Sequence, residues 1–126
     1  GEAAYAEAGI KNPREEISMA ELHDCFSITE AVTCEDLKFS PKGKVKQDIE
    51  SGFFNLDGKL PVQPDGGLKS FGHPIGASGV RMLFEMYLQL QGKADKRQIK
   101  NPKFGLTHNL GGIPVSNTVS VLIIGL

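Results

Sequence analysis

Several features that mark particular classes of protein are scarce or missing in this sequence. Cysteine occurs only twice, as Cys25 and Cys34, which is too few for a framework of disulfides. No apolar run reaches the roughly 18 residues that a transmembrane helix needs. No signal-peptide pattern is visible either. These absences predict a soluble, cytoplasmic protein that does not enter a membrane.

An excess of charge of one sign is also missing. The chain carries 14 Lys and Arg residues against 15 Asp and Glu residues, which gives a formal net charge of −1. A balance so close to zero argues against partners such as nucleic acid or an anionic membrane surface. The short basic cluster of Lys42, Lys44 and Lys46 is typical of a solvated loop, with contact to an anionic ligand as the alternative.

The residues that are present fit one ordinary globular domain. A length of 126 residues is enough to bury a core, and 40% apolar and 23% charged residues are typical values. The chain begins at Gly1 with an Ala- and Glu-rich stretch that is typical of a helix already under way. We therefore interpret residues 1–126 as one domain and as a piece of a longer or processed protein.

The hydrophobic pattern predicts helices and strands in alternation. We expect helices over 2–8, 26–37, 45–52 and 75–90, and strands over 16–22, 104–109 and 116–126. The Asp57-Gly58 pair between apolar residues favours a β-hairpin. This order predicts an α/β fold with a mixed sheet and helices on its faces. The last strand ends in a continuous apolar run, so we expect it at the centre of the sheet.

The spacing of apolar residues also predicts which helix faces are buried. In the second predicted helix we expect Ile28, Ala31 and Val32 on the inner side. The last predicted helix has apolar residues all round, Val80 and Phe84 among them. A helix of this kind is normally covered on several sides.

The stretch "GGLKSFGHPIGASG" (66–79) is the first candidate site. Pro74 suits the first turn of a helix, which would place His73 at the helix cap. The positive end of a helix disfavours a protonated imidazole, so His73 would be a neutral general base. The glycines allow positive φ values and close approach of a ligand or backbone. The alternative is a glycine-rich turn in which His73 is only a cap.

The stretch "ELHDCFS" (21–27) is the second candidate site. His23 and Cys25 lie where a predicted strand hands over to a helix, the end of a sheet at which ligands bind. A helix N-terminus lowers the pKa of a thiol, so Cys25 is a candidate acid, base or nucleophile. The alternatives are a buried small apolar residue, or a metal site with His73 that lacks a fourth ligand. We expect Cys34 in the core.

The stretch "THNLGG" (107–112) is the third candidate site. His108 and Asn109 end a predicted strand, and Gly111 and Gly112 follow. Backbone N–H groups on such a glycine loop can form an oxyanion hole. A plain turn before the last strand is the alternative.

In order and spacing, "HDCF", "GGLKSFGHPIGASG" and "HNLGG" resemble motifs of the C-terminal part of the thiolase superfamily, with "GHPIGASG" the most specific mark. "HDCF" and "HNLGG" are similar to the sterol carrier protein X type and archaeal-type branch. The resemblance covers essentially the whole chain. It implies the C-terminal half of a thiolase fold from which the first strand is missing.

The resemblance implies an acyl-CoA C-acyltransferase that makes or cleaves the C–C bond of a 3-ketoacyl-CoA, with coenzyme A as substrate and with no cofactor and no metal. His73 would activate a nucleophilic cysteine, and its N–H would help to hold the acyl oxygen. His23 would stabilise the thioester enolate, and Cys25 would move the α-proton. Further residues are implied near the substrate: Asn109, Gly111 and Gly112 at oxyanion and substrate positions, and Gly72, Gly76 and Ser78 in a loop near CoA.

Two departures from the family pattern stand out. The acyl-accepting cysteine of the family belongs to an N-terminal domain, and neither Cys25 nor Cys34 matches its motif, so we expect the chain alone to be inactive. Gln63 precedes the glycine pair where the family often has Asn, which puts a substrate hydrogen bond there in doubt. The resemblance further implies a homo-oligomer and allows a separate acyl-CoA-binding subunit with an OB-fold and a zinc ribbon.

Two other functions are compatible with the motifs. One is a thiolase-fold aldolase subunit that cleaves a β-hydroxyacyl-CoA side chain. Such proteins use tyrosines and lose parts of the catalytic set, so the presence of His23, Cys25 and His73 argues against it. The other is a non-catalytic, thiolase-like scaffold.

Overall fold

The computed structural model describes residues 1–113 and 115–126 and has the expected α/β architecture. Its helices are α1 (Glu2–Ala8), α2 (Pro13–Glu16), α3 (Ser27–Asp36), α4 (Val45–Glu50), α5 (Gly67–Phe71), α6 (Ser78–Leu90) and the 3-10 turn η1 (Asp95–Arg97). Its strands are β1 (Met19–Glu21), β2 (Phe104–Ile113) and β3 (Ser116–Gly125). Among the described residues, α1 is the first element.

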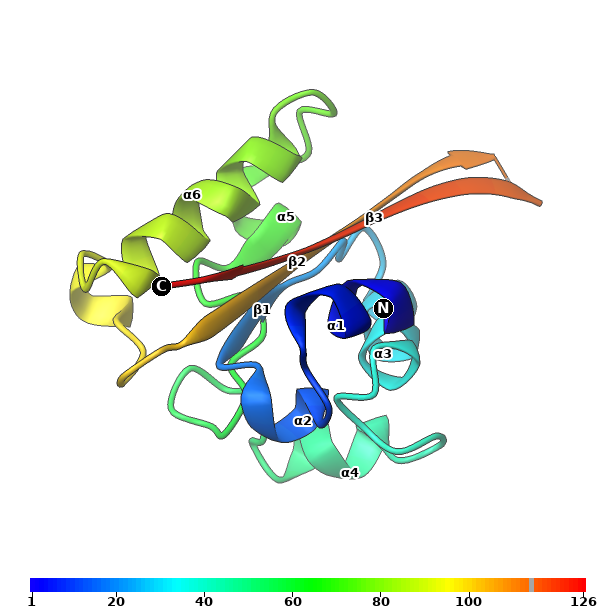
Figure 1. Cartoon of the computed structure of the whole chain (residues 1–126). Helices are drawn as coiled ribbons and strands as arrows, with labels where there is room; N and C mark the ends of the chain where they lie inside the picture. The colour runs from blue at the N-terminus through cyan, green and yellow to red at the C-terminus, as the bar shows by residue number, and fades with distance from the viewer. Residues whose placement is uncertain (114) are drawn as a thin grey trace.

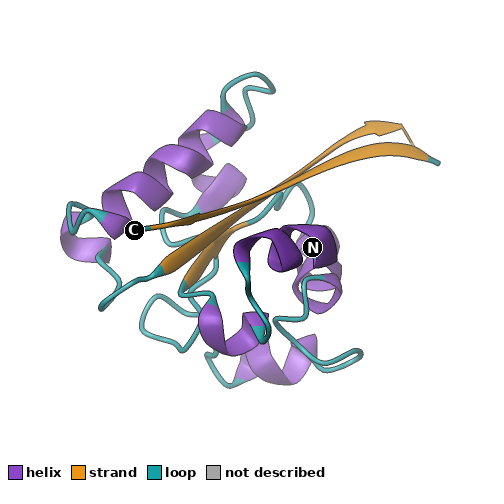
Figure 2. Ribbon diagram, viewed as in Figure 1, coloured by secondary structure: helices purple, strands orange, loops and turns teal. Residues whose placement is uncertain are grey.

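The sheet is mixed, and helices cover both of its faces. The strand order is β1-β2-β3, with β1 parallel to β2 and β2 antiparallel to β3. An isolated parallel bridge joins Ala20 to Val62 beside β1. Helices α5 and α6 lie on one face and α1 to α4 on the other, while the β2–β3 hairpin extends beyond the body (Figures 1 and 2). The sheet therefore separates two helical layers.

Alternation along the strands divides the core between the two layers. Met19 belongs to a small cluster on the α6 face, together with Met86, Leu90 and Ile99. Its neighbour Ala20 belongs to the larger cluster on the other face, where Tyr5 and Phe39 also lie. Because successive strand residues point to opposite faces, adjacent positions on β1 serve different layers.

Helix α3 forms where expected, but its buried face was predicted wrongly. Ile28 and Val32 are exposed, whereas Thr33 and Cys34 are buried. The core position of Cys34 is confirmed. Ile28 and Val32 lie about one turn apart, as an apolar stripe should, yet they line an open hollow between α3 and the β2–β3 hairpin instead of a packed core. Periodicity identified a stripe correctly but could not say what covers it.

Helix α6 is covered on one side only. Met82 and Met86 have no exposed surface, whereas Val80 and Phe84 are 66% and 59% exposed. The expectation that the helix is covered on several sides is therefore wrong for the described chain. The helix is also shorter than predicted, because it begins at Ser78 after a separate turn at Pro74.

Two strand predictions also need correction. Asp57-Gly58 lies in a run of turns rather than between two strands. Among the described residues, only two backbone hydrogen bonds join its flanks, from Leu60 N–H to the Phe53 carbonyl and from Val62 N–H to the Phe54 carbonyl, each 3.1 Å long. Strand β3 lies at the edge of the sheet and not at its centre. Its apolar run arises because both faces are covered near its end: Val121 packs against one core cluster and Ile124 against the other.

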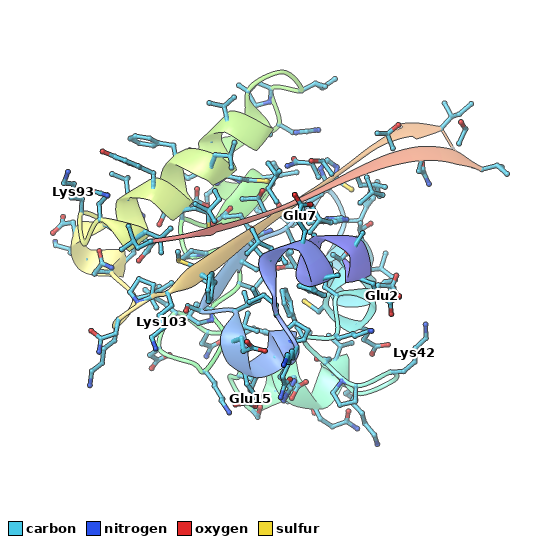
Figure 3. All side chains as sticks on the ribbon, in the orientation of Figure 1. Glu2, Glu7, Glu15, Lys42, Lys93 and Lys103 are labelled. Carbon is cyan, nitrogen blue, oxygen red and sulfur yellow. The ribbon has the colours of Figure 1, made fainter. Side chains whose placement is uncertain are left out.

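The surface agrees with the balanced composition. The six charged side chains labelled in Figure 3, three Glu and three Lys, point outward around the body. Lys42 is exposed and pairs with Asp36 at 3.7 Å, as a solvated loop residue would. Among the described residues, no helix has the length and apolarity required to span a bilayer.

Candidate active site

His23 lies just beyond the carboxyl end of β1, on the α6 face of the sheet. Met19 and Glu21 face the same way, so strand alternation brings the His23 side chain to this face. The side-chain amide of Gln63 holds the backbone of Leu22, the residue before His23. Its Oε1 accepts a hydrogen bond from the Leu22 N–H at 3.1 Å, and its Nε2 donates to the Leu22 carbonyl at 2.6 Å. Gln63 thus continues the ladder beside β1 and has both amide groups engaged.

The loop that carries His73 is held in place by two carboxylates. Asp65 Oδ1 accepts the Gly67 N–H at 2.8 Å, and Asp24 Oδ1 accepts the Leu68 N–H at 2.8 Å. Both carboxylates satisfy N–H groups at the start of α5, a short helix that the sequence analysis missed. Gly67 has φ +65°, and a Cβ there would lie 2.5 Å from the Asp24 carboxylate, so this position requires glycine.

His73 itself is not a helix cap. It lies in the exposed segment 72–77 between α5 and α6, and the N-cap of α6 is Ala77. The Pro74 carbonyl accepts the N–H groups of Ala77 and Ser78, so Pro74 starts a turn but not the helix. The prediction that a helix terminus acts directly on His73 is therefore wrong.

Ser78 is buried beneath His73. It is 2% exposed, and its Oγ lies 2.7 Å from Nδ1 of His73. The other ring nitrogen, Nε2, lies on the far side of the imidazole from this contact. The implied place of Ser78, with Gly72 and Gly76, in a loop near CoA stays a prediction.

The two candidate histidines meet at the wall of one open hollow. Their ring centroids are 4.9 Å apart, and the rings are edge-to-face at 83°. The hollow has a volume of about 450 Å³. Its lining residues are His23, His73, Ile75, Asn109, Leu110, Gly111, Gly112, Thr118 and Ser120. The structure thus brings together one residue or more from each of the three predicted motifs.

The glycines of the third motif are part of a strand and not of a loop. Gly111 and Gly112 continue β2 and stand opposite Thr118 and Asn117 of β3. Gly112 has φ +113°, and a Cβ there would lie 2.5 Å from the Ser116 carbonyl oxygen. The strand predicted over 104–109 was too short, because glycine is normally rare inside strands. Donation of an oxyanion-hole N–H by either glycine stays a prediction.

Burial lowers the pKa of two of the three histidines, His23 and His108. Desolvation lowers the pKa of His23, and the nearby His73 adds to this effect. Desolvation, followed by the influence of His23, lowers the pKa of His108 to about 4. The Nδ1 atoms of His23 and His108 are buried without a hydrogen-bond partner among the described residues. A neutral imidazole can donate one N–H to a developing oxyanion, which suits the role predicted for His23.

His108 and Asn109 are neighbours in the sequence but lie on opposite faces of the sheet. Asn109 lines the histidine hollow, and Gly79 of α6 approaches its side chain. His108 lines a different hollow against α3, beside Thr29 and Val32. Only Asn109 therefore belongs to the candidate site.

A buried charged cluster underlies His23. Arg81 of α6 pairs with Asp65 and lies 3.1 Å from Oε2 of Glu21, which has no exposed surface. Burial, together with the nearby Asp65, raises the pKa of Glu21 to about 9. Glu21 is therefore protonated at neutral pH, and Arg81 also pairs with Asp65. This cluster joins β1, α6 and the loop before α5.

Cys25 lies close to the site but not in its wall. It directly precedes Phe26, the N-cap residue of α3, and its Sγ lies 3.8 Å from the Thr29 hydroxyl. Like Gly72, Gly76 and Ser78, it does not line the histidine hollow. Cys34 is inert by contrast, because burial raises the pKa of its thiol to about 12. The catalytic role of Cys25 stays a prediction.

A metal centre is not supported. Within residues 1–113 and 115–126, no three His, Cys, Asp or Glu side chains gather closely enough to hold a metal ion. The alternative of a metal bound by His23, Cys25 and His73 is therefore wrong for the described residues.

Sequence reasoning missed three contributors to the site. Asp24 was treated only as part of "HDCF", although its carboxylate caps α5. Thr118 and Ser120 of β3 also line the hollow. Strand pairing was the signal for these two, since they stand opposite Gly111 and Asn109.

Comparisons with known proteins identify the family of the chain. The family model described as "Thiolase C-terminal domain-like" matches residues 1–124. The acetyl-CoA acetyltransferase of Methanothermobacter thermautotrophicus is 46% identical over 97 residues, which cover 77% of this chain and 25% of that protein. Sterol carrier protein 2 of Homo sapiens is 44% identical over 107 residues, which cover 85% of this chain and 19% of that protein.

A solved structure shows the same fold. The Ltp2-ChsH2(DUF35) aldolase matches with a TM-score of 0.79 and 27% sequence identity, over 98% of this chain and 30% of that one. The chain thus spans a quarter or less of the length of the two curated relatives just named. With the family model matching nearly every residue, the chain belongs to the thiolase C-terminal domain-like family.

Proposed function

We propose that this chain is the C-terminal part of a thiolase-like acyl-CoA acyltransferase and supplies half of its active site. The observation that carries the proposal is the edge-to-face pair of His23 and His73 in one hollow with Asn109. The similarity to acetyl-CoA acetyltransferases supports the same reaction class. The nucleophilic cysteine comes from an N-terminal domain.

In cleavage, the upstream cysteine thiolate attacks the 3-keto carbon of the substrate. The bond between C2 and C3 breaks, and its electron pair leaves on C2 as the enolate of a shorter acyl-CoA. His23 donates its N–H to the enolate oxygen, and Cys25 returns a proton to C2. His73 accepts the thiol proton of the upstream cysteine, and this proton then restores the Cys25 thiol. His73 next accepts the thiol proton of free CoA, whose thiolate removes the acyl group, and returns that proton to the released upstream cysteine.

The surface around the hollow is suited to such a partner domain. Phe71 and Ile75, on either side of His73, are 57% and 87% exposed. The apolar stripe of Ile28 and Val32 on α3, on the other face of the sheet, is exposed as well. Exposed apolar residues this close together mark surfaces that another protein covers. We propose that the N-terminal domain covers them in the longer protein, which forms a homo-oligomer. The longer protein uses CoA as a substrate and needs no cofactor.

A second candidate is an aldolase subunit, because the solved structural match is named as an aldolase. In that case the substrate is a β-hydroxyacyl-CoA, no acyl-enzyme forms, and a separate OB-fold subunit accompanies the chain. Two observations favour the acyltransferase. The chain keeps both histidines and Cys25, and neither of its tyrosines, the buried Tyr5 and the α6 residue Tyr87, lines the hollow.

The test compares two cysteines in the longer protein that carries this chain. Cys25→Ala should suppress exchange of the α-protons of an acyl-CoA with D₂O, while acylation of the upstream cysteine continues. Cys34→Ala is the matched control and should leave exchange unchanged, because that thiol is buried away from the hollow. Mass spectrometry measures both exchange and acylation.

His73→Ala should slow acylation by roughly 10²-fold or more, since it removes the base. Normal exchange in Cys25→Ala would show that Cys25 is not the proton carrier. Cleavage of a β-hydroxyacyl-CoA without any acyl-enzyme would favour the aldolase, and lack of turnover on either substrate would leave the scaffold as the function.

A further inference from the structure

The Ser78 hydroxyl links His73 to the backbone at the start of α6. Ser78 Oγ lies 2.7 Å from Nδ1 of His73 and donates to the Pro74 carbonyl at 3.2 Å. The same carbonyl accepts the N–H groups of Ala77 and Ser78, so the turn that begins α6 fixes its position. Ser78 itself is 2% exposed, which keeps water from competing for its hydroxyl.

We propose that Ser78 is a positioning residue that holds His73 as the tautomer protonated on Nδ1. A serine hydroxyl has a single proton to donate. When that proton is directed to the Pro74 carbonyl, only a lone pair faces His73, so Nδ1 must carry the hydrogen. The opposite tautomer would turn the hydroxyl proton toward Nδ1 and leave two oxygen atoms 3.2 Å apart with no proton between them.

This arrangement leaves the lone pair of His73 on Nε2. Because Nδ1 is tied beneath the ring, Nε2 lies on the opposite side, and the imidazole stands in the wall of the hollow. Uptake of a proton on Nε2 leaves the Nδ1–H···Oγ bond unchanged. The group can therefore act as a base without rearrangement of its support, as pre-organised sites do.

The role of Nε2 as the base rests on the proposed function. The tautomer of His73 does not, because it depends only on groups within this chain. His73 is exposed, and nothing else among the described residues is hydrogen-bonded to its ring. Ser78 is therefore the group that selects between the two nitrogens.

Histidine-selective ¹⁵N labelling of the 126-residue chain tests the proposal directly. The chain has three histidines, and the signals that disappear in the His73→Gln variant are those of His73. Long-range ¹H–¹⁵N correlation spectra, recorded where the shifts no longer change with pH, should give a protonated, pyrrole-type Nδ1 and an unprotonated, pyridine-type Nε2 for His73. A pyridine-type Nδ1 in the unmodified chain would overturn the proposal without any variant.

Ser78→Ala removes the partner, so both nitrogen shifts of His73 should move toward the averaged values of an imidazole that exchanges between tautomers. Ser78→Thr keeps the hydroxyl and should restore the original shifts. The signals of His23 and His108 serve as internal controls and should stay in place. Unchanged His73 shifts in Ser78→Ala would also contradict the proposal. Loss of acyl transfer in the longer protein bears only on the proposed function, since these spectra need no substrate.

Discussion

The two faces of the sheet use the same strands for opposite purposes. On the face that α1 and α3 cover, β1 and β2 present Ala20, Leu22 and Leu106, all without exposed surface, to a continuous apolar core. On the α6 face the intervening position is Glu21, whose buried carboxyl group lies beside Arg81, and His23 follows. Adjacent residues of the same strand, such as Ala20 and Glu21, therefore give the two faces their different character.

The comparison shows that the two faces are stabilised in different ways. The apolar face depends on shape and on removal of surface from water. The α6 face contains paired charges and hydrogen-bonded carboxylates: Arg81 pairs with Asp65 and lies beside Glu21, and Asp24 accepts N–H groups of α5. Buried polar atoms without a hydrogen-bond partner among the described residues occur on both faces, at Nδ1 of His23 on the α6 face and at Nδ1 of His108 on the apolar side.

The largest expected effect lies on the apolar face. Leu106→Ala should lower the free energy of unfolding by about 2–5 kcal/mol, because a fully buried leucine leaves a cavity. Urea unfolding of the chain, monitored by circular dichroism, measures the change. Asn109→Ala is the control on the other face. Its side chain lines the open hollow, so the expected change is about 0.5 kcal/mol or less. Equal effects at the two positions would remove the distinction between the faces.

The next largest effect is a pH dependence of stability caused by His108, the buried histidine on the apolar face. The folded pKa of His108, about 4, lies below the unfolded value of 6.5. His108 therefore favours the folded state fully above pH 6.5, and this contribution is lost as pH falls toward 4. The loss is on the order of 3 kcal/mol. Urea unfolding between pH 7 and pH 4 measures it.

His108→Gln is the control for this pH dependence, since glutamine does not titrate. Glu21 acts with the opposite sign: its raised folded pKa makes its contribution complete below pH 4.5 and weaker toward pH 9. Only the difference between the unmodified chain and His108→Gln isolates the histidine. Parallel curves for the two proteins would show that His108 is as easily protonated in the fold as in the unfolded chain.

The smallest effect concerns the loop that carries His73. Gly67→Ala should lower the free energy of unfolding by about 1–3 kcal/mol, because φ is +65° and the added Cβ would press on the Asp24 carboxylate. Gly76→Ala, in the same motif, has no atom within 4 Å of its added Cβ and should change stability by about 0.5 kcal/mol or less. Thermal unfolding measures the stability of both variants. A similar loss of stability in Gly67→Ala and Gly76→Ala would show that the strain is not specific to Gly67.

The sequence predicted most of the elements but not their surroundings. The helix over 2–8 was found from its Ala- and Glu-rich composition. The helices over 26–37 and 45–52 and the two closing strands were found from the pattern of apolar residues, which reflects the local geometry of the chain. The short α5 was missed because its cap is Asp24, more than forty residues away. The burial of Ile28 and Val32 was predicted wrongly for a related reason: periodicity identifies an apolar stripe, whereas its cover depends on other chain segments.

The sequence by itself determined which residue types are available to the site and the order in which they come: a histidine after the first strand, a second histidine in a glycine-rich loop, and an asparagine before two glycines. The tertiary structure alone decided that His23 and His73 meet at 4.9 Å, that His108 faces away, and that Ser78 lies beneath His73. Motif order is carried by the covalent chain. Contact across fifty residues is decided by strand pairing and by the packing of α6 on the sheet, which no local pattern contains.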